Sequence, residues 1–233
     1  GSSYAEKVAA PSWRLVKLPD ALDVESGAAV MLQGMTAHYL VHSTYPLGPG
    51  DTCLVHAAAG GVGLLLTQMA KLLGSTVIAT VSSAEKAKLA YGAGADYVIN
   101  YSESDFQKEV MGISGGKGIQ VVYDAVGLTT FEKSMECLGQ RGTMVLYGQA
   151  SGHVPQISPS ILGSKSLFLT RPSLVAYTAT REELLKRAND VLGWIADGTL
   201  NLRIHNTFHL SEAQEAHRQL DGRISTGKII MKP

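Results

Sequence analysis

Short apolar runs alternate with amphipathic stretches through the middle of the chain. The runs are rich in β-branched residues and read TCLVHA, TVIATV, YVIN, IQVVYDAV, GTMVLYG and SLFLT, within residues 52–170. Most are continuously apolar, which is typical of strands that helices cover on both faces. Helical spacing of apolar residues fills the gaps, at about 61–73, 84–91, 103–111 and 128–137. The pattern predicts an α/β fold with a doubly wound, six-stranded parallel sheet.

The pattern differs on either side of this region. Residues 4–26 are expected to be an extended opening segment, and residues 27–43 a pair of helices closed by a turn. Thr180 precedes the charged residues REE, which is the pattern of a capping box and predicts a helix reaching about Asp197. Two short strands, at about 204–209 and 227–232, are predicted on either side of a further helix.

A glycine-rich turn, AAAGGVG, joins the first predicted strand to the first amphipathic helix. This order suits a dinucleotide pyrophosphate, because free N–H groups at the start of a helix bind anions. Gly60 and Gly61 would leave the backbone accessible, and Gly63 would let the helix pack closely on the strand. Ala57 replaces the usual first glycine, and we expect its φ to stay negative. A simple tight turn is the alternative, but the succession of strands favours a Rossmann dinucleotide site.

The end of the second strand indicates which dinucleotide is bound. No acidic residue stands where an NAD-specific site holds the ribose hydroxyls; Ser82 and Ser83 follow the strand and Lys86 lies in the next helix. Hydroxyl and ammonium groups suit a 2′-phosphate, which accepts charge-assisted hydrogen bonds. NADPH is therefore predicted over NADH. The alternative is that Ser82 caps the helix and Lys86 is a solvated surface residue.

Charge and composition narrow the classes of partner. Twenty basic residues balance twenty acidic ones, so no global field would draw the protein to nucleic acid or to an anionic membrane. No apolar run is long enough to span a bilayer and no signal peptide is recognised, so a cytoplasmic protein is expected. Cys53 and Cys137 are expected to be free and buried, and the scattered histidines predict no metal site. Residues 1–3 resemble the scar of a cleaved tag.

Several longer stretches together resemble one family. They are RLVKLPDALDVESGAAVMLQGMTAHYL, HAAAGGVGLL, GADYVINYSESDF, VVYDAVG, RPSL and EAQEAH with STGKIIM. Over nearly the whole chain they are similar to the zinc-independent, zeta-crystallin-like quinone oxidoreductases of the medium-chain dehydrogenase/reductase superfamily. The resemblance implies NADPH-dependent reduction of quinones by hydride transfer. An enone (2-alkenal) reductase and a non-catalytic module for NADPH binding and dimerisation are the alternatives.

The resemblance also implies which residues bind the cofactor, whereas it assigns no catalytic residue. The adenosine phosphate pocket would use Ser82, Lys86, Tyr101 and Arg223. The glycine turn and the nicotinamide side would contribute Ala59, Gly60, Gly61, Val62, Gly63, Thr36, Val126, Gly148 and Gln149, with Phe168 and Thr170 nearby. Five of these residues could instead have no role in binding. Thr36 could be an ordinary helix residue, Arg223 a solvated charge, and Tyr101, Phe168 and Thr170 strand residues.

Members of this family begin with a β-rich, GroES-like lobe, which is expected to be largely absent here through an engineered truncation or a natural short form. Residues 1–33 would then be the tag scar and a remnant of that lobe or its linker, 34–171 the NADPH-binding Rossmann domain, and 172–233 a segment returning to the lobe. Because the substrate cleft lies between the lobes, we expect cofactor binding without efficient turnover. Relatives pair their sixth strands edge to edge, which implies a homodimer.

Overall fold

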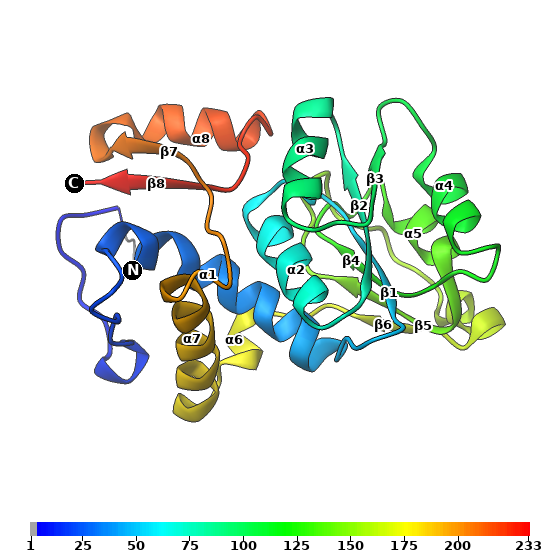
Figure 1. The fold of residues 1–233 in the computed structure, drawn as a ribbon, viewed down its shortest axis with the longest axis horizontal. Helices are drawn as coiled ribbons and strands as arrows, with labels where there is room; N and C mark the ends of the chain where they lie inside the picture. The colour runs from blue at the N-terminus through cyan, green and yellow to red at the C-terminus, as the bar shows by residue number, and fades with distance from the viewer. Residues whose placement is uncertain (1–3) are drawn as a thin grey trace.

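The computed structural model describes residues 4–233, so the tag scar expected at residues 1–3 lies outside the described residues. Its centre is a six-stranded parallel sheet with the strand order β3-β2-β1-β4-β5-β6 (Figure 1). The strands are β1 (Thr52–Val55), β2 (Thr76–Val81), β3 (Tyr97–Asn100), β4 (Ile119–Asp124), β5 (Leu138–Leu146) and β6 (Phe168–Thr170). The predicted fold class is confirmed. The strand order reverses between β1 and β4, where folds of this kind bind ligands at the carboxyl ends of the strands.

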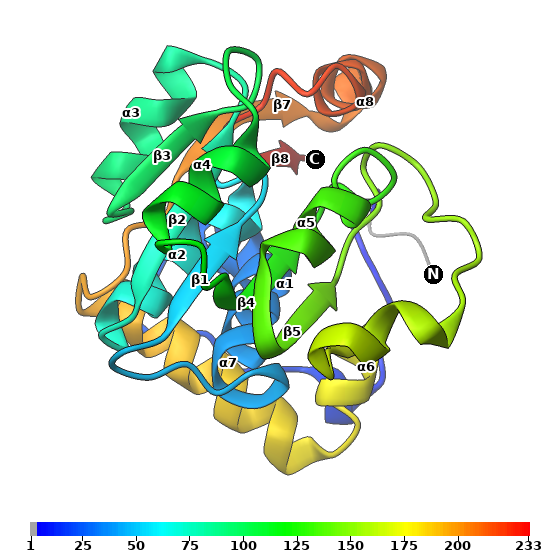
Figure 2. The same cartoon turned by 90° about the vertical axis from the view of Figure 1, so that its right-hand side faces the viewer.

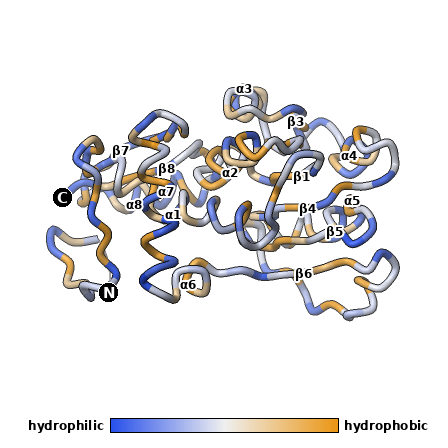
Figure 3. Tube along the Cα trace, turned by 60° about the horizontal axis from the view of Figure 1, so that its bottom comes forward, coloured by the Kyte–Doolittle hydropathy of each residue, from blue (hydrophilic) through white to orange (hydrophobic). Residues whose placement is uncertain are grey.

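Helices cover both faces of the sheet (Figures 1 and 2). One face packs against α1 (Val24–Tyr39), α2 (Gly61–Leu72) and α3 (Ala84–Gly92), and the other against α4 (Phe106–Ile113) and α5 (Phe131–Cys137). Each strand therefore buries both of its faces, which explains the continuously apolar runs. Figure 3 shows these hydrophobic stretches gathered around the central strands.

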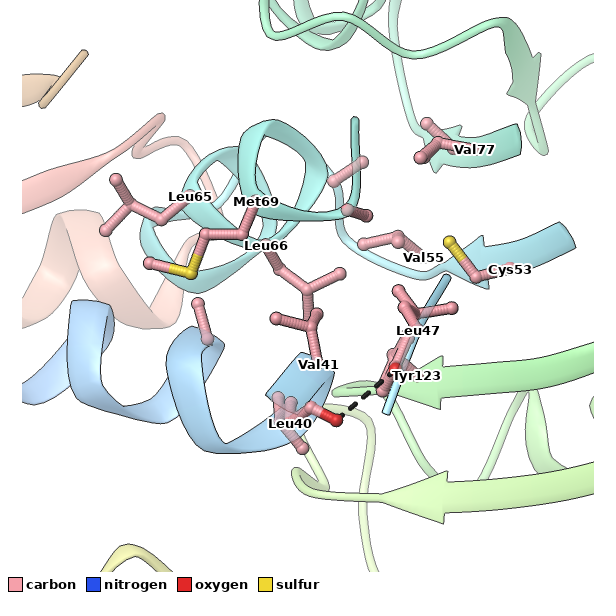
Figure 4. Packing of buried hydrophobic residues seen from close by; sticks show 14 of the residues in the cluster. Leu40, Val41, Leu47, Cys53, Val55, Leu65, Leu66, Met69, Val77 and Tyr123 are labelled. Atoms are coloured by element: carbon pink, nitrogen blue, oxygen red, sulfur yellow. Dashed lines mark hydrogen bonds between the residues drawn. The ribbon is translucent and has the colours of Figure 1, made fainter. Parts of the chain in front are cut away.

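The side chains of β1 show how the two cores divide. Cys53 and Val55 belong to the cluster beneath α1 and α2, whereas Leu54 points into the cluster beneath α4 and α5. In Figure 4, Val55 lies close to Leu66 of α2. The alternation follows from the period of two along a strand. It fixes β1, and with it the turn at its carboxyl end, between two packed layers.

Residues 27–43 form one helix, and the predicted pair of helices was wrong. The carboxylate of Asp23 caps α1 by accepting a hydrogen bond from the Ser26 N–H at 2.7 Å. The helix then continues into a π-helical turn, Leu40–Thr44. Gly34 does not break the helix, because a Cβ there would collide with Val191 and its absence lets a later helix pack closely. α1 is thus one uninterrupted helix that packs against the sheet.

The last part of the chain comprises α6 (Leu174–Tyr177), α7 (Arg181–Ala196), β7 (Ile204–His209), α8 (Ala213–Asp221) and β8 (Lys228–Lys232). The predicted capping box at Thr180 is confirmed: its hydroxyl accepts from the Glu183 N–H, and the Glu183 carboxylate accepts from the Thr180 N–H. β7 and β8 form a separate two-stranded parallel sheet (Figure 1). Just before β8, the Gly227 N–H donates to the Ala59 carbonyl at 3.1 Å, which ties this end of the chain to the glycine turn.

Candidate cofactor site

The turn after β1 uses a left-handed residue at its first motif position. Ala57 has a φ of 52°, which contradicts the negative φ expected from the sequence. The conformation is enforced by its neighbours, because the N–H groups of His56 and Ala58 are bonded to carbonyls of β4 and β2, and the Ala57 carbonyl accepts from the Gly60 N–H at 2.9 Å. A left-handed conformation costs an alanine about 1 kcal/mol. The turn thus keeps the shape that a glycine would adopt freely.

The three motif glycines have three different surroundings. A Cβ on Gly63 would collide with the backbone of residues 57–58, so the missing side chain lets α2 pack closely on the turn that follows β1. A Cβ on Gly60 would have only one neighbour within 4 Å, a carbonyl oxygen at 3.1 Å, so its face stays open. Gly61 differs from both, because the carboxamide of Gln33 occupies the place of its missing side chain. The bare face that the turn offers to a phosphate is therefore that of Gly60.

A crevice of about 380 Å³ lies between this turn and the loop that joins α8 to β8. It brings together predicted site residues from five separate segments of the chain: Ala59, Gly60, Ser82, Lys86, Tyr101, Val126 and Arg223. The opposite wall is made by Leu220, Gly222 and Ser225, which the sequence reasoning missed. Apart from Ser225, which begins the stretch STGKIIM, no motif covers that wall, and the pairing of Gly227 with Gly60 brings it beside the turn.

The predicted phosphate pocket is a cluster of hydroxyl and cationic groups. Lys86 Nζ donates to Ser82 Oγ at 3.2 Å and to the Arg223 carbonyl oxygen at 2.8 Å. The residue that caps α3 is Ser83, whose Oγ accepts from the Lys86 N–H, so the alternative that Ser82 is the cap was wrong. Burial, and then the nearby charge of Arg223, lower the pKa of Lys86. Two cations held this close together favour an anion between them.

Arg223 crosses the crevice from one end to the other. Its backbone is left-handed, with a φ of 55°, and its guanidinium Nη2 donates to the Ala150 carbonyl at 2.8 Å. The same residue accepts from Lys86 through its own carbonyl. Arg223 is exposed, but these contacts on both sides distinguish it from the freely solvated charge that was the alternative. The segment 222–226 therefore forms a strap across the crevice.

The loop after β4 is fixed by a buried carboxylate. Asp124 accepts hydrogen bonds from the Val126 N–H at 2.7 Å, the Gly127 N–H at 3.0 Å and the Thr130 hydroxyl at 2.7 Å. Gly148 packs on this loop, since a Cβ there would lie 2.6 Å from the carbonyl oxygen of residue 125. Asp124 was missed by the sequence reasoning, although its place at the carboxyl end of β4 was a usable signal. It holds Val126 at the edge of the crevice.

Other predicted site residues do not line the crevice. Thr36 Oγ1 donates to the Leu32 carbonyl of its own helix at 2.8 Å, and Val62 packs against the core beneath α1 and α2. Phe168 and Thr170 lie on the edge strand β6, and Gln149 follows β5 without reaching the crevice. The structure thus gathers the adenosine-side residues and Val126 in the crevice, while the rest of the nicotinamide-side set stays a prediction from the resemblance.

Comparisons with known proteins agree with this geometry. The zinc-binding dehydrogenase family model matches residues 61–192. A quinone oxidoreductase of Pseudomonas aeruginosa is 44% identical over 232 residues, covering 99% of this chain and 71% of that protein. A 2-haloacrylate reductase of a Burkholderia species is 42% identical over 235 residues, with the same coverage of each. A mycobacterial protein solved with NADPH has 46% identity and a TM-score of 0.95, covering 99% of this chain and 71% of that one.

A metal centre does not fit the described residues. Within residues 4–233, no group of three or more His, Cys, Asp or Glu side chains could hold a metal ion. Cys53 and Cys137 are free and buried, as expected, and burial raises the pKa of each thiol to about 12. Zinc binds cysteine as the thiolate, so neither thiol suits it. No helix in the described chain has the length and hydropathy needed to cross a membrane.

These three proteins are each more than 40% identical to this chain and each cover 99% of it. The chain belongs to the quinone oxidoreductase family of the medium-chain dehydrogenase/reductase superfamily.

Proposed function

We propose that the chain binds NADPH in the crevice and serves the reduction of quinones by hydride transfer. The observation that carries the proposal is the cluster of Ser82, Lys86 and Arg223 at the end of a crevice that begins at the open face of Gly60. The family's named quinone oxidoreductases and the NADPH complex of a close structural relative support it. When bound, NADPH supplies the hydride from C4 of its nicotinamide.

The chain's own residues bind and orient the cofactor. Ser82 Oγ and Lys86 Nζ would hold the 2′-phosphate, with Tyr101 and Arg223 beside them. The open face of Gly60 at the start of α2 would receive the pyrophosphate, because free N–H groups and the helix dipole favour negative charge there. The residues present fit such a ligand, because the lining of the crevice includes both the open face of Gly60 and the hydroxyl and cationic groups of Ser82, Lys86 and Arg223.

The nicotinamide half would extend toward the loop after β4. Val126 is held there by Asp124, and Gly148 packs on the same loop. Val62, Gln149 and Thr36 would border the ring, and Phe168 and Thr170 would lie farther along the sheet. Residues that fix the ring relative to a substrate contribute to catalysis by orientation, so no protein nucleophile is required.

The acceptor is proposed to be a quinone, with an α,β-unsaturated carbonyl as the second candidate. The second candidate is favoured by the 42% identical relative named 2-haloacrylate reductase. The alternative to both of these enzyme activities is a non-catalytic NADPH-binding module. The comparison of NADPH oxidation with 1,4-benzoquinone, with 2-chloroacrylate and without acceptor separates the three, because only an enzyme raises the rate above the no-acceptor background.

We further infer the organisation and the setting of the protein. Residues 34–171 would be the NADPH-binding unit, 172–233 the returning segment and 1–33 a linker remnant, with α1 continuous across the first boundary. A homodimer would form by pairing of β6, whose three residues bond only to β5 within the described chain.

The two free cysteines support a cytoplasmic location, where thiols stay reduced. Nucleic acid is not an expected partner because the net charge is zero.

Calorimetric titration of the chain with NADPH and with NADH tests the proposed cofactor directly. We expect saturable NADPH binding that is at least about tenfold tighter than NADH binding, as one charge-assisted phosphate contact would give. Absence of NADPH binding would contradict the proposed function as a whole. Binding without quinone-dependent oxidation would instead favour the non-catalytic module.

A further inference from the structure

Gln33 stands directly on the glycine turn, although no motif assigns it a role. It lies in α1, one helical turn before Thr36, and its carboxamide fills the space beside the α-carbon of Gly61. The Oε1 atom of Gln33 is buried and has no hydrogen-bond partner. Leaving a buried amide oxygen without a donor costs about 1–3 kcal/mol. An atom of this kind beside a ligand crevice is explained if the ligand supplies the missing donor.

Lys228 approaches the same place from the end of the chain. It lines a small cavity of about 140 Å³ together with Gln33, between α1, α8 and β8. The residue before it, Gly227, bridges Gly60 and donates its N–H to the Ala59 carbonyl. Lys228 is therefore held beside the turn by backbone pairing and not only by its own side chain.

The ammonium group of Lys228 has no counter-ion among residues 4–233, since it takes part in none of the ion pairs found there. The side chain is half-buried, and this burial lowers the pKa of Lys228. Removing a cation from water without a compensating partner is unfavourable. An anionic ligand at the turn would provide that partner.

The positions of the two pockets identify which part of the cofactor would reach these side chains. α2 packs against both α1 and α3 (Figure 1). Ser82 and Lys86 lie at the start of α3, whereas Gln33 and Lys228 lie at α1 and β8. A dinucleotide held by its 2′-phosphate near α3 and crossing the start of α2 would bring its pyrophosphate and second ribose to the α1 side.

We propose that Gln33 and Lys228 form a clamp on the middle of NADPH, in which Lys228 binds a pyrophosphate oxygen and Gln33 Oε1 accepts a hydrogen bond from a hydroxyl of the nicotinamide ribose. The clamp rests on the proposed function, because NADPH is its ligand. The clamp contacts a different part of the cofactor from the 2′-phosphate pocket. Changes to the clamp should therefore leave the affinity for fragments without the pyrophosphate unchanged.

Calorimetry with three ligands tests the clamp: 2′-AMP, which lacks the pyrophosphate, 2′-phospho-ADP-ribose, which lacks only the nicotinamide, and NADPH. We expect Gln33→Leu to weaken the two larger ligands about fivefold and Lys228→Met about tenfold, the effects of one neutral and one charge-assisted hydrogen bond. Both variants should bind 2′-AMP like the unmodified chain. Gln214→Leu and Lys88→Met, at exposed positions, are the matched controls and should change nothing.

Equal weakening of 2′-AMP and NADPH by Gln33→Leu would overturn the clamp, because it would show a general structural effect. Unchanged binding of all three ligands to both variants would overturn it as well. If Gln33→Leu does not fold, the test compares Lys228→Met with Lys228→Arg. Only Lys228→Arg should then retain affinity for the two larger ligands. Failure of the unmodified chain to bind NADPH is a different result, which contradicts the proposed function itself.

Discussion

The ammonium group of Lys86 lies 2.8 Å from the carbonyl oxygen of Arg223, although 137 positions separate the two residues in the chain. This contact brings the guanidinium-bearing strap 222–226 over the predicted phosphate pocket. Lys86 reaches it from α3 and Arg223 from the loop between α8 and β8. The two cations that the sequence suggested for one phosphate are thus neighbours in the fold.

Asp124→Asn should destabilise the protein and weaken NADPH binding. The carbonyl oxygen of asparagine can still accept from the Val126 and Gly127 N–H groups, which both donate to Oδ1 of Asp124, but its amide nitrogen cannot accept from the Thr130 hydroxyl. Loss of this bond, and of the charge that strengthens the other two, predicts a decrease of about 2 kcal/mol in the free energy of unfolding. Urea denaturation measures it, with the exposed Asp20→Asn as control. Equal stability of the two variants would contradict the role given to Asp124.

Ala57→Gly should stabilise the protein. Glycine adopts the φ of 52° without the steric cost that alanine bears, and it loses part of this gain through its greater freedom in the unfolded chain. The net expectation is an increase of up to about 0.5 kcal/mol in the free energy of unfolding. Ala59→Gly, at a neighbouring position without a positive φ, should instead lower it by a similar amount. A loss of stability in Ala57→Gly would refute the left-handed turn.

His38 should make stability depend on pH between about 4 and 6.5. Burial, assisted by His42, lowers the pKa of His38 to about 4 despite the contact of its Nε2 with Asp190 at 3.0 Å, and Arg187 and Lys186 add positive charge nearby. The unfolded state therefore binds the proton more readily, so stability is full above pH 6.5 and falls as the pH drops toward 4. The loss should reach about 3 kcal/mol.

The test compares urea denaturation of the unmodified chain and of His38→Gln at pH 7 and pH 5. Glutamine cannot titrate, so the variant should lose less stability than the unmodified chain over this interval. Parallel losses in the two proteins would assign the pH dependence to other groups, such as the buried His56, whose pKa is also lowered by burial.

Phe168→Arg should interfere with the proposed dimer. The Phe168 side chain is 61% exposed at the edge strand β6, which is an unusual place for a large aromatic group unless a partner covers it. Sedimentation velocity should show a dimer for the unmodified chain and a monomer for the variant. A monomeric unmodified chain would reject dimerisation through β6.

The sheet was predictable from sequence because strands buried on both faces leave a continuous apolar signal, as TVIATV does in β2. The helix over residues 24–39 was not fully predictable, because Gly34 looks like a break until Val191 is seen to need its space. Helices and strands could be predicted where neighbouring residues in the sequence determine them. Contacts between segments that are distant in the sequence could not.

The candidate site divides in the same way. Gly60, Ser82 and Lys86 follow strands directly, so their place at the carboxyl edge of the sheet could be inferred. The sign of φ at Ala57 could not, because it depends on hydrogen bonds to β2 and β4. Gln33 was missed for a related reason: its contact with Gly61 arises from the packing of α1 on α2, which no local pattern encodes.

Calorimetric titration of the unmodified chain and of Lys86→Met with NADPH and NADH tests the assignment of the 2′-phosphate pocket. We expect the unmodified chain to prefer NADPH, and Lys86→Met to lose about tenfold in NADPH affinity while its NADH affinity stays the same, since only the 2′-phosphate meets Lys86. Equal affinity of the unmodified chain for both cofactors, or an equal loss of both in the variant, would contradict it.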